Sequence, residues 1–468
     1  MYELTISLRQ GDRTPLYEQI YDYIKNEIRE GRISSGEKLP STRLLSRHLD
    51  ISRSTVELAY EQLLSEGYIE SRPQRGYYAS QIEGLYRIRA TKPSGKESVI
   101  DEKPAYRYDF TPNGVDLNSF PYSAWRKLSR ECLLDDRAEL FRLGCPQGEP
   151  GLRSAICSYL HQARGVNCSP DQIIVGAGND YLMMLLCAVL GTGHRVALEN
   201  PTYRQAYRLF ANLSFDTRTV DMDAKGMRVD ELERSGADLA FVMPSHQYPL
   251  GTVMPIRRRM ELLRWASEAK GRFIIEDDYD SEFRYKGKPI PALQGYDADG
   301  KVIYIGTFSK SIAPAIRMSY MVLPEKVCEM YHKRCGFISS TVSKVDQLIL
   351  QKFIEEGYYE RHLNKMRALY RSRHDVLLSG VKEMGDDYTV SGENAGVHLL
   401  IHFRDGRPER ELIRLAAEKG VKVYGLSEYY VDGARAPEES VILLGYANMD
   451  EQKIKEAVRL LESAWKRK

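Results

Sequence analysis

Lys310 is the residue whose neighbours most clearly suggest chemistry. It lies in the stretch IGTFSKSIAPAIR after the strand-like run KVIY, so Thr307 and Ser309 precede it and Arg317 follows seven residues later. A Ser-Lys pair by itself is typical of a surface turn. An amine with hydroxyls and an arginine at the end of a buried strand instead suits nucleophilic chemistry beside a bound anion. The other strands must decide between these two interpretations.

Five strand-like runs in the C-terminal region each end in a polar or glycine-containing segment. They are QIIV before GAGND, RVAL before ENPTY, LAFVM before PSHQYPLG, FII before EDDYDSEF, and VIYI before GTFSKS. In open parallel sheets, ligands bind beyond the carboxyl ends of the strands. The sequence therefore predicts that these five segments converge on one crevice.

An anion-binding end of this crevice is predicted from three of the segments. The guanidinium of Arg317 would hold a phosphate through two hydrogen bonds, assisted by the hydroxyls of Thr307 and Ser309. Free backbone N–H groups at the start of the helix NDYLMMLLCAVL, after Gly178 and at Asn179, would bind the same phosphate.

The remaining polar groups match the ring and aldehyde of pyridoxal phosphate (PLP). Lys310 would form a Schiff base with the aldehyde, since a desolvated amine near cationic groups stays nucleophilic at neutral pH. Asp277 would keep the pyridine nitrogen protonated, Tyr279 would donate a hydrogen bond to the ring hydroxyl, and Tyr203 would stack on the ring. Taken singly, Asp277 as a helix cap, Tyr203 in a core and Arg317 in a salt bridge are ordinary alternatives.

Length and composition indicate a globular protein. The 468 residues suffice for about two to four domains, and 43% are hydrophobic. No apolar run is long enough to cross a bilayer, and MYELTISLRQ lacks the features of a signal peptide, so we expect a cytoplasmic protein with no membrane partner. Seven cysteines without close C-x-x-C spacing indicate reduced thiols and no metal site.

Two regions and a linker are predicted from the pattern along the chain. Residues 1–80 contain helical runs with short connections, and residues 106–468 alternate apolar strand runs with amphipathic helices, as in a parallel α/β sheet. Residues 81–105 contain Gly, Pro and charges without a sustained period, which is typical of an exposed linker. Within the second region we expect a large domain over about 106–340 and a small one over about 341–468.

The first region has the pattern of a winged helix-turn-helix. Apolar residues share one face of a helix over 16–28, and Ser41 precedes a second helix that extends to about Leu49. Ser52 precedes a third, longer helix, and SRPQRGYYAS follows as a β-hairpin wing. Acidic and basic residues nearly cancel here, so charge alone favours an ordinary three-helix bundle. The cations nevertheless cluster where DNA phosphates would lie.

This first region resembles the GntR-type DNA-binding domain. The residues that carry the resemblance are Pro15-Leu16-Tyr17, Gly36, Leu39-Pro40-Ser41-x-Arg43, Arg53-x-Thr55-Val56, Tyr60, Leu63, Gly67 and Arg75-Gly76. The resemblance implies that the protein binds operator DNA. The residues implied to contact it are Arg43, Arg53, Ser54, Thr55, Arg75 and Gly76.

The second region resembles fold-type I aminotransferases, and both regions together resemble the MocR/GabR-type subgroup of GntR regulators. The most specific matches are Thr307-Phe308-Ser309-Lys310 with Arg317, Glu276-Asp277-Asp278-Tyr279-Asp280-Ser281-Glu282-Phe283, Pro244-Ser245-His246-Gln247 with Gly251, and Pro112-Asn113-Gly114-Val115-Asp116. The resemblance implies an α/β PLP-dependent transferase-like fold, with a mainly parallel seven-stranded sheet and a small α/β domain. It also implies a homodimer.

The sequence departs from these families where a carboxylate would be held. Leu443 stands where working aminotransferases carry an arginine for the substrate α-carboxylate, and Tyr248 replaces the asparagine that holds the ring hydroxyl. Gln205 and Glu428 lie near the points where the GABA-responsive member of the subgroup uses arginines, which argues against GABA as the effector. These losses favour a sensor over an efficient catalyst.

We therefore expect a PLP-dependent transcription regulator that senses an amino acid or amine effector through an aldimine at Lys310. Effector binding would shift the small domain and change affinity for DNA. We expect no physiological turnover, although a residual aminotransferase activity is compatible with the residues. Two alternatives stay open: an active aminotransferase with an appended DNA-binding domain, and a regulator of vitamin B6 metabolism that senses PLP itself.

Overall fold

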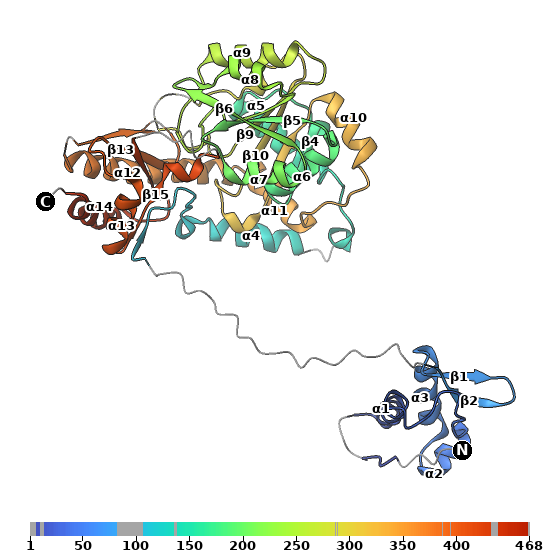
Figure 1. Ribbon diagram of the computed structural model, residues 1–468. Helices are drawn as coiled ribbons and strands as arrows, with labels where there is room; N and C mark the ends of the chain where they lie inside the picture. The colour runs from blue at the N-terminus through green and yellow to red at the C-terminus, as the bar shows by residue number, and fades with distance from the viewer. Residues whose placement is uncertain are drawn as a thin grey trace. The chain divides into compact units, whose positions relative to one another are not determined.

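The computed structural model describes residues 6–9, 14–81, 106–134, 138–285, 287, 289–385, 387–393, 395–431 and 439–466. The chain forms two compact units, one within residues 1–101 and the other within residues 102–468 (Figure 1). The predicted linker 81–105 lies outside the described residues except for Gln81. Within the described residues, no helix combines the length and apolar character that a bilayer crossing requires.

The N-terminal unit has the predicted helices and hairpin. Its elements are α1 (Leu16–Arg29), α2 (Thr42–His48), α3 (Arg53–Ser65), β1 (Ile69–Arg72) and β2 (Gly76–Ala79). Ser41 caps α2 by accepting a hydrogen bond from the Leu44 N–H, and Ser52 caps α3 through the Thr55 N–H. The antiparallel pair β1 and β2 joins Ile69 to Ala79 in register. The predicted helix starts at Ser41 and Ser52 are confirmed.

An eight-stranded sheet organises the C-terminal unit, with strand order β4-β11-β10-β9-β8-β5-β6-β7. The strands are β4 (Ile173–Gly176), β5 (Arg195–Asn200), β6 (Asp216–Asp223), β7 (Gly226–Met227), β8 (Leu239–Val242), β9 (Phe273–Asp278), β10 (Val302–Thr307) and β11 (Ser319–Val322). Neighbours from β10 to β6 run parallel, and β11 runs antiparallel between β10 and β4. The sheet has one strand more than the expected seven, because the two-residue β7 folds back onto β6.

Helices cover both faces of this sheet (Figure 1). The helices are α4 (Tyr122–Leu133), α5 (Pro150–Arg164), α6 (Asn179–Leu190), α7 (Arg204–Asn212), α8 (Val229–Ser235), α9 (Ile256–Ser267), α10 (Glu325–Arg334) and α11 (Lys344–Glu355). On one face α6, α7 and α10 pack on side chains such as Ile174 and Ile303. On the other, α4, α5 and α11 pack on Ile173 and Val175, and α8 and α9 on Ile274. Strands buried on both faces are typical of a parallel α/β sheet.

The C-terminal part of this unit is a smaller α/β layer. The four-stranded sheet has the order β12-β13-β16-β15, and β14 pairs with β3 near the start of the unit. The elements are α12 (Tyr358–Glu383), β12 (Tyr388–Ser391), β13 (His398–Phe403), α13 (Glu409–Glu418), β14 (Val421–Lys422), β15 (Tyr424–Gly425), β16 (Ser440–Gly445), α14 (Glu451–Trp465) and β3 (Tyr108–Asp109). A cluster that includes Leu399, Ile442 and Trp465 forms its core.

Candidate functional site

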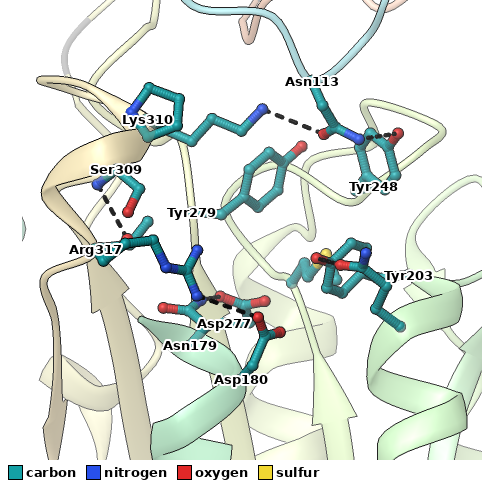
Figure 2. A pocket seen from close by; sticks show the side chains of 14 residues that line it. Asn113, Asn179, Asp180, Tyr203, Tyr248, Asp277, Tyr279, Ser309, Lys310 and Arg317 are labelled. Atoms are coloured by element: carbon teal, nitrogen blue, oxygen red, sulfur yellow. Dashed lines mark hydrogen bonds and ion pairs between the residues drawn. The ribbon is translucent and has the colours of Figure 1, made fainter. Parts of the chain in front are cut away.

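A pocket of about 300 Å³ lies beyond the carboxyl ends of the central strands (Figure 2). All five of the polar segments predicted to converge contribute to its lining. The lining residues are Asn113, Asn179, Asp180, Tyr203, Gln205, Met243, Tyr248, Asp277, Tyr279, Thr307, Ser309, Lys310, Pro314 and Arg317. Of the residues predicted to bind the cofactor, Gly178 alone is not in this lining, and it lies directly beside Arg317.

The anion-binding end combines Arg317, Ser309 and the start of α6. Arg317 adopts a left-handed backbone conformation with φ 45° at the end of a short 3-10 turn, and its Nη2 lies 3.3 Å from Asp180 Oδ2. Gly178 has φ 93°, and a Cβ there would lie 2.4 Å from Arg317 Nη2. Only glycine therefore lets the guanidinium rest against the start of α6. The Ser309 N–H donates to Thr307 Oγ1 at 3.1 Å.

Lys310 extends into the pocket from the segment after β10. Its Nζ donates to Asn113 Oδ1 at 3.2 Å, and the Asn113 amide nitrogen donates to Tyr248 Oη at 3.4 Å (Figure 2). Burial lowers the pKa of Lys310 from its usual 10.5 to about 8. A lysine with this pKa carries a useful fraction of the neutral, nucleophilic amine near neutral pH.

Asp277 is the buried carboxylate of the pocket lining, and it is the last but one residue of β9. It accepts a hydrogen bond from Asn179 Nδ2 at 3.2 Å. Burial, reinforced by the nearby carboxylates Asp278 and Asp280, raises the pKa of Asp277 to about 7. Burial makes the ionised form of this carboxyl group unfavourable when no positive charge is near. A protonated ring nitrogen would supply that charge and stabilise the ionised carboxylate.

Tyr279 is held from behind by a buried histidine. Tyr279 Oη lies 3.0 Å from His246 Nδ1, which lies 2.9 Å from Asp280 Oδ2. His246 and Asp280 are both buried. This contact adds a constraint that the sequence-based prediction for Tyr279 did not include.

The rest of the wall is aromatic. The rings of Tyr203 and Tyr248 meet edge to face at 6.1 Å, and Tyr248 meets Tyr279 in the same way at 5.9 Å. The Tyr203 hydroxyl contacts the Gln205 side chain. Tyr248 Oη lies 2.8 Å from Tyr429 Oη, which joins the wall to the smaller α/β layer.

The residues of the pocket fit PLP. Ser309 Oγ and Asn179 Oδ1 are buried with no hydrogen-bond partner among the described residues, so each retains capacity for a ligand. Arg317, Gly178 and Ser309 form one cradle for an anion, while Lys310 and Asp277 project into the same cavity. An aldehyde, a phosphate and a basic ring nitrogen are the groups that this donor set complements.

The residues implied to contact DNA lie on α2, at the start of α3 and on the hairpin. Arg43, Arg53, Ser54 and Arg75 are exposed, and Gly76 begins β2. Arg53 Nε pairs with Glu57 Oε1 at 2.7 Å. Thr55 is half-buried, and its hydroxyl lies 2.7 Å from the Ser52 hydroxyl that caps the helix.

Sequence reasoning assigned no role to four groups that shape this site. Asn113 bridges Lys310 and Tyr248, Asp180 pairs with Arg317, and His246 with Asp280 supports Tyr279. Asn113, His246 and Asp280 lie in the segments that carried the family resemblance. The sequence therefore marked these positions, but it did not show which side chains they contact, and their roles depend on those contacts. Asp180 follows Asn179 directly at the start of α6.

Comparison with known proteins identifies the class. The family description "Bacterial regulatory proteins, gntR family" matches residues 16–78, and "Aminotransferase class I and II" matches residues 113–461. The chain is 42% identical to an uncharacterized HTH-type transcriptional regulator, YhdI of Bacillus subtilis (strain 168), over 99% of this chain and 98% of that protein. It is 31% identical to the probable rhizopine catabolism regulatory protein MocR of Rhizobium meliloti, over 96% and 94%.

Among solved structures, the chain is similar to the kynurenine aminotransferase of Pyrococcus horikoshii in complex with PMP. The identity is 26% and the TM-score 0.68, over 78% of this chain and 91% of that one. Fold and site thus define a winged helix-turn-helix joined to a fold-type I aminotransferase-like domain. The chain belongs to the MocR-type subgroup of the GntR family. It is a DNA-binding, PLP-dependent transcription regulator.

The positions that depart from working aminotransferases lie around the aromatic wall. Leu443 is fully buried on β16 in an apolar cluster against which Tyr429 packs. Gln205 is exposed and lines the pocket. Glu428 is exposed, and its backbone carbonyl accepts a hydrogen bond from Arg204 Nη1 at 2.8 Å.

Proposed function

We propose that this protein senses a primary amine or amino acid at Lys310 and converts its binding into a change in affinity for operator DNA. The observation that carries this proposal is the position of the Lys310 amine. The residue is half-buried beside the anion cradle, and its amine is hydrogen-bonded into a chain that leads out of the pocket. As a DNA-binding regulator, the protein would act in the cytoplasm.

Different residues of the pocket would hold different groups of the cofactor. When bound, PLP supplies an aldehyde carbon that reacts with one primary amine at a time. Arg317, Ser309 and the N–H groups at the start of α6 hold the phosphate, and Asp277 holds a proton at the ring nitrogen. Tyr279 orients the ring hydroxyl, and Tyr203 covers the ring face.

A hydrogen-bonded chain offers a route from Lys310 to the smaller α/β layer. Lys310 donates to Asn113, Asn113 to Tyr248, and Tyr248 contacts Tyr429 in the turn 426–429. A lysine amine that is free can make the first of these bonds, and one that is engaged elsewhere cannot. The chain therefore gives the two states of Lys310 different contacts, which is what coupling to a second site requires.

We also propose that the protein is a homodimer. Large apolar side chains are exposed on α4 and on the segments that flank it, with Leu143 87% exposed. The others in this stretch are Leu117, Tyr122, Leu133, Leu134 and Phe141. An apolar groove formed in part by Leu117 and Tyr122 also includes Ala313, Ala315 and Ile316, between Lys310 and Arg317. A second copy would cover this surface next to the site.

The dimer is tested by measuring mass in solution by light scattering. The wild-type chain should have twice the mass of one subunit, and Leu143→Glu should shift the equilibrium towards the monomer. Leu143→Met is the matched control and should remain dimeric. A wild-type protein that is monomeric at micromolar concentration would contradict this part of the proposal.

The sensing function is tested with full-length protein and a DNA duplex that the protein itself selects from a random pool. Amines and amino acids are added singly while visible absorbance, keto product and duplex affinity are measured. A spectral shift with altered DNA affinity and no product supports a sensor. Steady product formation would make the protein an aminotransferase, and a response of DNA affinity to PLP alone would make it a PLP sensor.

A further inference from the structure

The two cations that line the pocket are both required by the cofactor. Among the described lining residues, these cations are Lys310 and Arg317. Arg317 already lies against Asp180 and serves the phosphate end. Arg204 follows the wall residue Tyr203, but its Nη1 donates to the Glu428 carbonyl. Lys310 would become a free amine when an effector takes its place, and its Nζ then donates to Asn113 Oδ1. An effector carboxylate would therefore find each lining cation already paired with another group.

The wall left for the effector is formed largely by tyrosines. Tyr248 meets three other tyrosine rings edge to face: Tyr203 at 6.1 Å, Tyr279 at 5.9 Å and Tyr429 at 5.3 Å. Met243 adds an apolar surface to the same lining. Aromatic faces bind other aromatic rings and ammonium groups, and a tyrosine side chain carries no positive charge that would neutralise an anion.

Behind this wall the small layer is apolar. Leu400, Leu426, Val441 and Leu443 form a buried cluster, and Tyr429 packs against it. Leu443 pairs with Leu400 across β16 and β13 in register. None of these four residues is among the residues that line the pocket, so the cluster supports the wall through Tyr429 and offers no charged group to a ligand.

The charges around the pocket favour a cation. The lining contains two carboxylates, Asp180 and Asp277, against two cations, and a phosphate monoester adds about −1.5 to −2 at neutral pH. Outside the lining, the exposed Arg204 and Glu428 carry opposite charges, and Arg204 Nη1 donates to the Glu428 carbonyl, so these two residues add no net charge. A proton on the ring nitrogen would return one positive charge, which still leaves the lining negative overall with PLP bound. This negative charge attracts an ammonium group and repels a carboxylate.

We propose that the effector is a primary amine without a carboxylate, an alkyl or arylalkyl amine, selected by the tyrosine wall and by the negative charge of the lining. This inference rests on the proposed sensing function and names its ligand class. The amino group reacts at the site of Lys310, and the rest of the molecule lies against Tyr203 and Tyr248.

The test compares each protein amino acid, except aspartate, glutamate and proline, with the primary amine that remains when its α-carboxyl group is removed. Full-length protein is loaded with PLP, and dissociation constants are measured from the visible absorbance change. At least one amine should bind tenfold or more tightly than its amino acid partner, and no amino acid should bind more tightly than its amine. Amino acids that bind as tightly as their amines would overturn the inference and leave amine sensing intact. No response to any compound, with PLP bound, would contradict the proposed sensing function itself.

A substitution at the pocket mouth supplies the cation that the wild-type lining lacks. Gln205 is exposed and lines the pocket, so Gln205→Arg should fold normally and bring a guanidinium to the wall. It should narrow the ratio of amine to amino acid affinity by about tenfold, and Gln205→Met, of similar length but neutral, should leave the ratio unchanged. An unchanged ratio in Gln205→Arg would show that a missing cation does not set the preference.

Discussion

Replacing Gly178 with alanine tests whether Arg317 holds the phosphate of the cofactor. An added Cβ would lie 2.4 Å from Arg317 Nη2 and 2.8 Å from its Cζ, so the guanidinium has to move away. A hydrogen bond to a charged group contributes about 1.5–3 kcal/mol. Displacing the guanidinium should therefore weaken PLP binding by about tenfold to a hundredfold.

A second glycine separates this effect from backbone strain. Gly178 has φ 93° and Gly193 has φ 94°, and a Cβ at Gly193 meets no atom within 4 Å. An L-residue in this region of backbone space costs about 1–3 kcal/mol. Gly178→Ala and Gly193→Ala should both lower the free energy of unfolding of the apo-protein by this amount in urea titrations. Only Gly178→Ala should lower PLP affinity, measured by absorbance titration.

The result that refutes this reasoning is a Gly178→Ala protein that binds PLP as tightly as Gly193→Ala. A double variant sharpens the test. If the alanine acts by displacing Arg317, then Gly178→Ala combined with Arg317→Ala should bind PLP no more weakly than Arg317→Ala alone. Additive losses would mean that Gly178 contributes through another contact.

Three further predictions concern a pKa, a buried charge and DNA. Because burial lowers the pKa of Lys310 to about 8, the rate at which PLP attaches to the protein should rise with pH, by up to about tenfold per pH unit below pH 8, and level off above it. Stopped-flow absorbance measures this rate. A rate that does not change from pH 6 to 8 would contradict the role of the Lys310 amine as the nucleophile. The pKa of Asp277 is raised to about 7, so its burial destabilises the apo-protein increasingly as pH rises from about 4 through 7. Asp277→Asn should therefore raise the Tm of the apo-protein at pH 8, while it weakens PLP binding. A lowered Tm would show that the ionised Asp277 carboxylate does not destabilise the apo-protein. Arg75→Ala should weaken operator binding and reduce the slope of log affinity against log salt by about one, with the exposed Arg142→Ala as a control; an unaltered slope would exclude a phosphate contact.

Much of the fold was predictable because it depends on local pattern. The helices that follow Ser41 and Ser52 begin where short hydroxyl side chains cap them, within the same few residues. The five strand-like runs correspond to β4, β5, β8, β9 and β10. The strands β6, β7 and β11 have no counterpart among these runs. The strand β11 lies between β10 and β4, and its pairing with β4 joins segments that are more than 100 residues apart in the sequence.

By itself, then, the sequence determined which residue types stand at the ends of the strands, and from them the class of cofactor. Their assignment to individual groups of PLP stays a prediction. Tertiary structure decided the partners: Asn113 meets Lys310 across 197 positions, and Asp180 meets Arg317 across 137. It also decided the shifted pKa values of Lys310 and Asp277, because desolvation depends on which segments cover a group. Contacts and burial of this kind arise from packing between distant segments, which local periodicity does not encode.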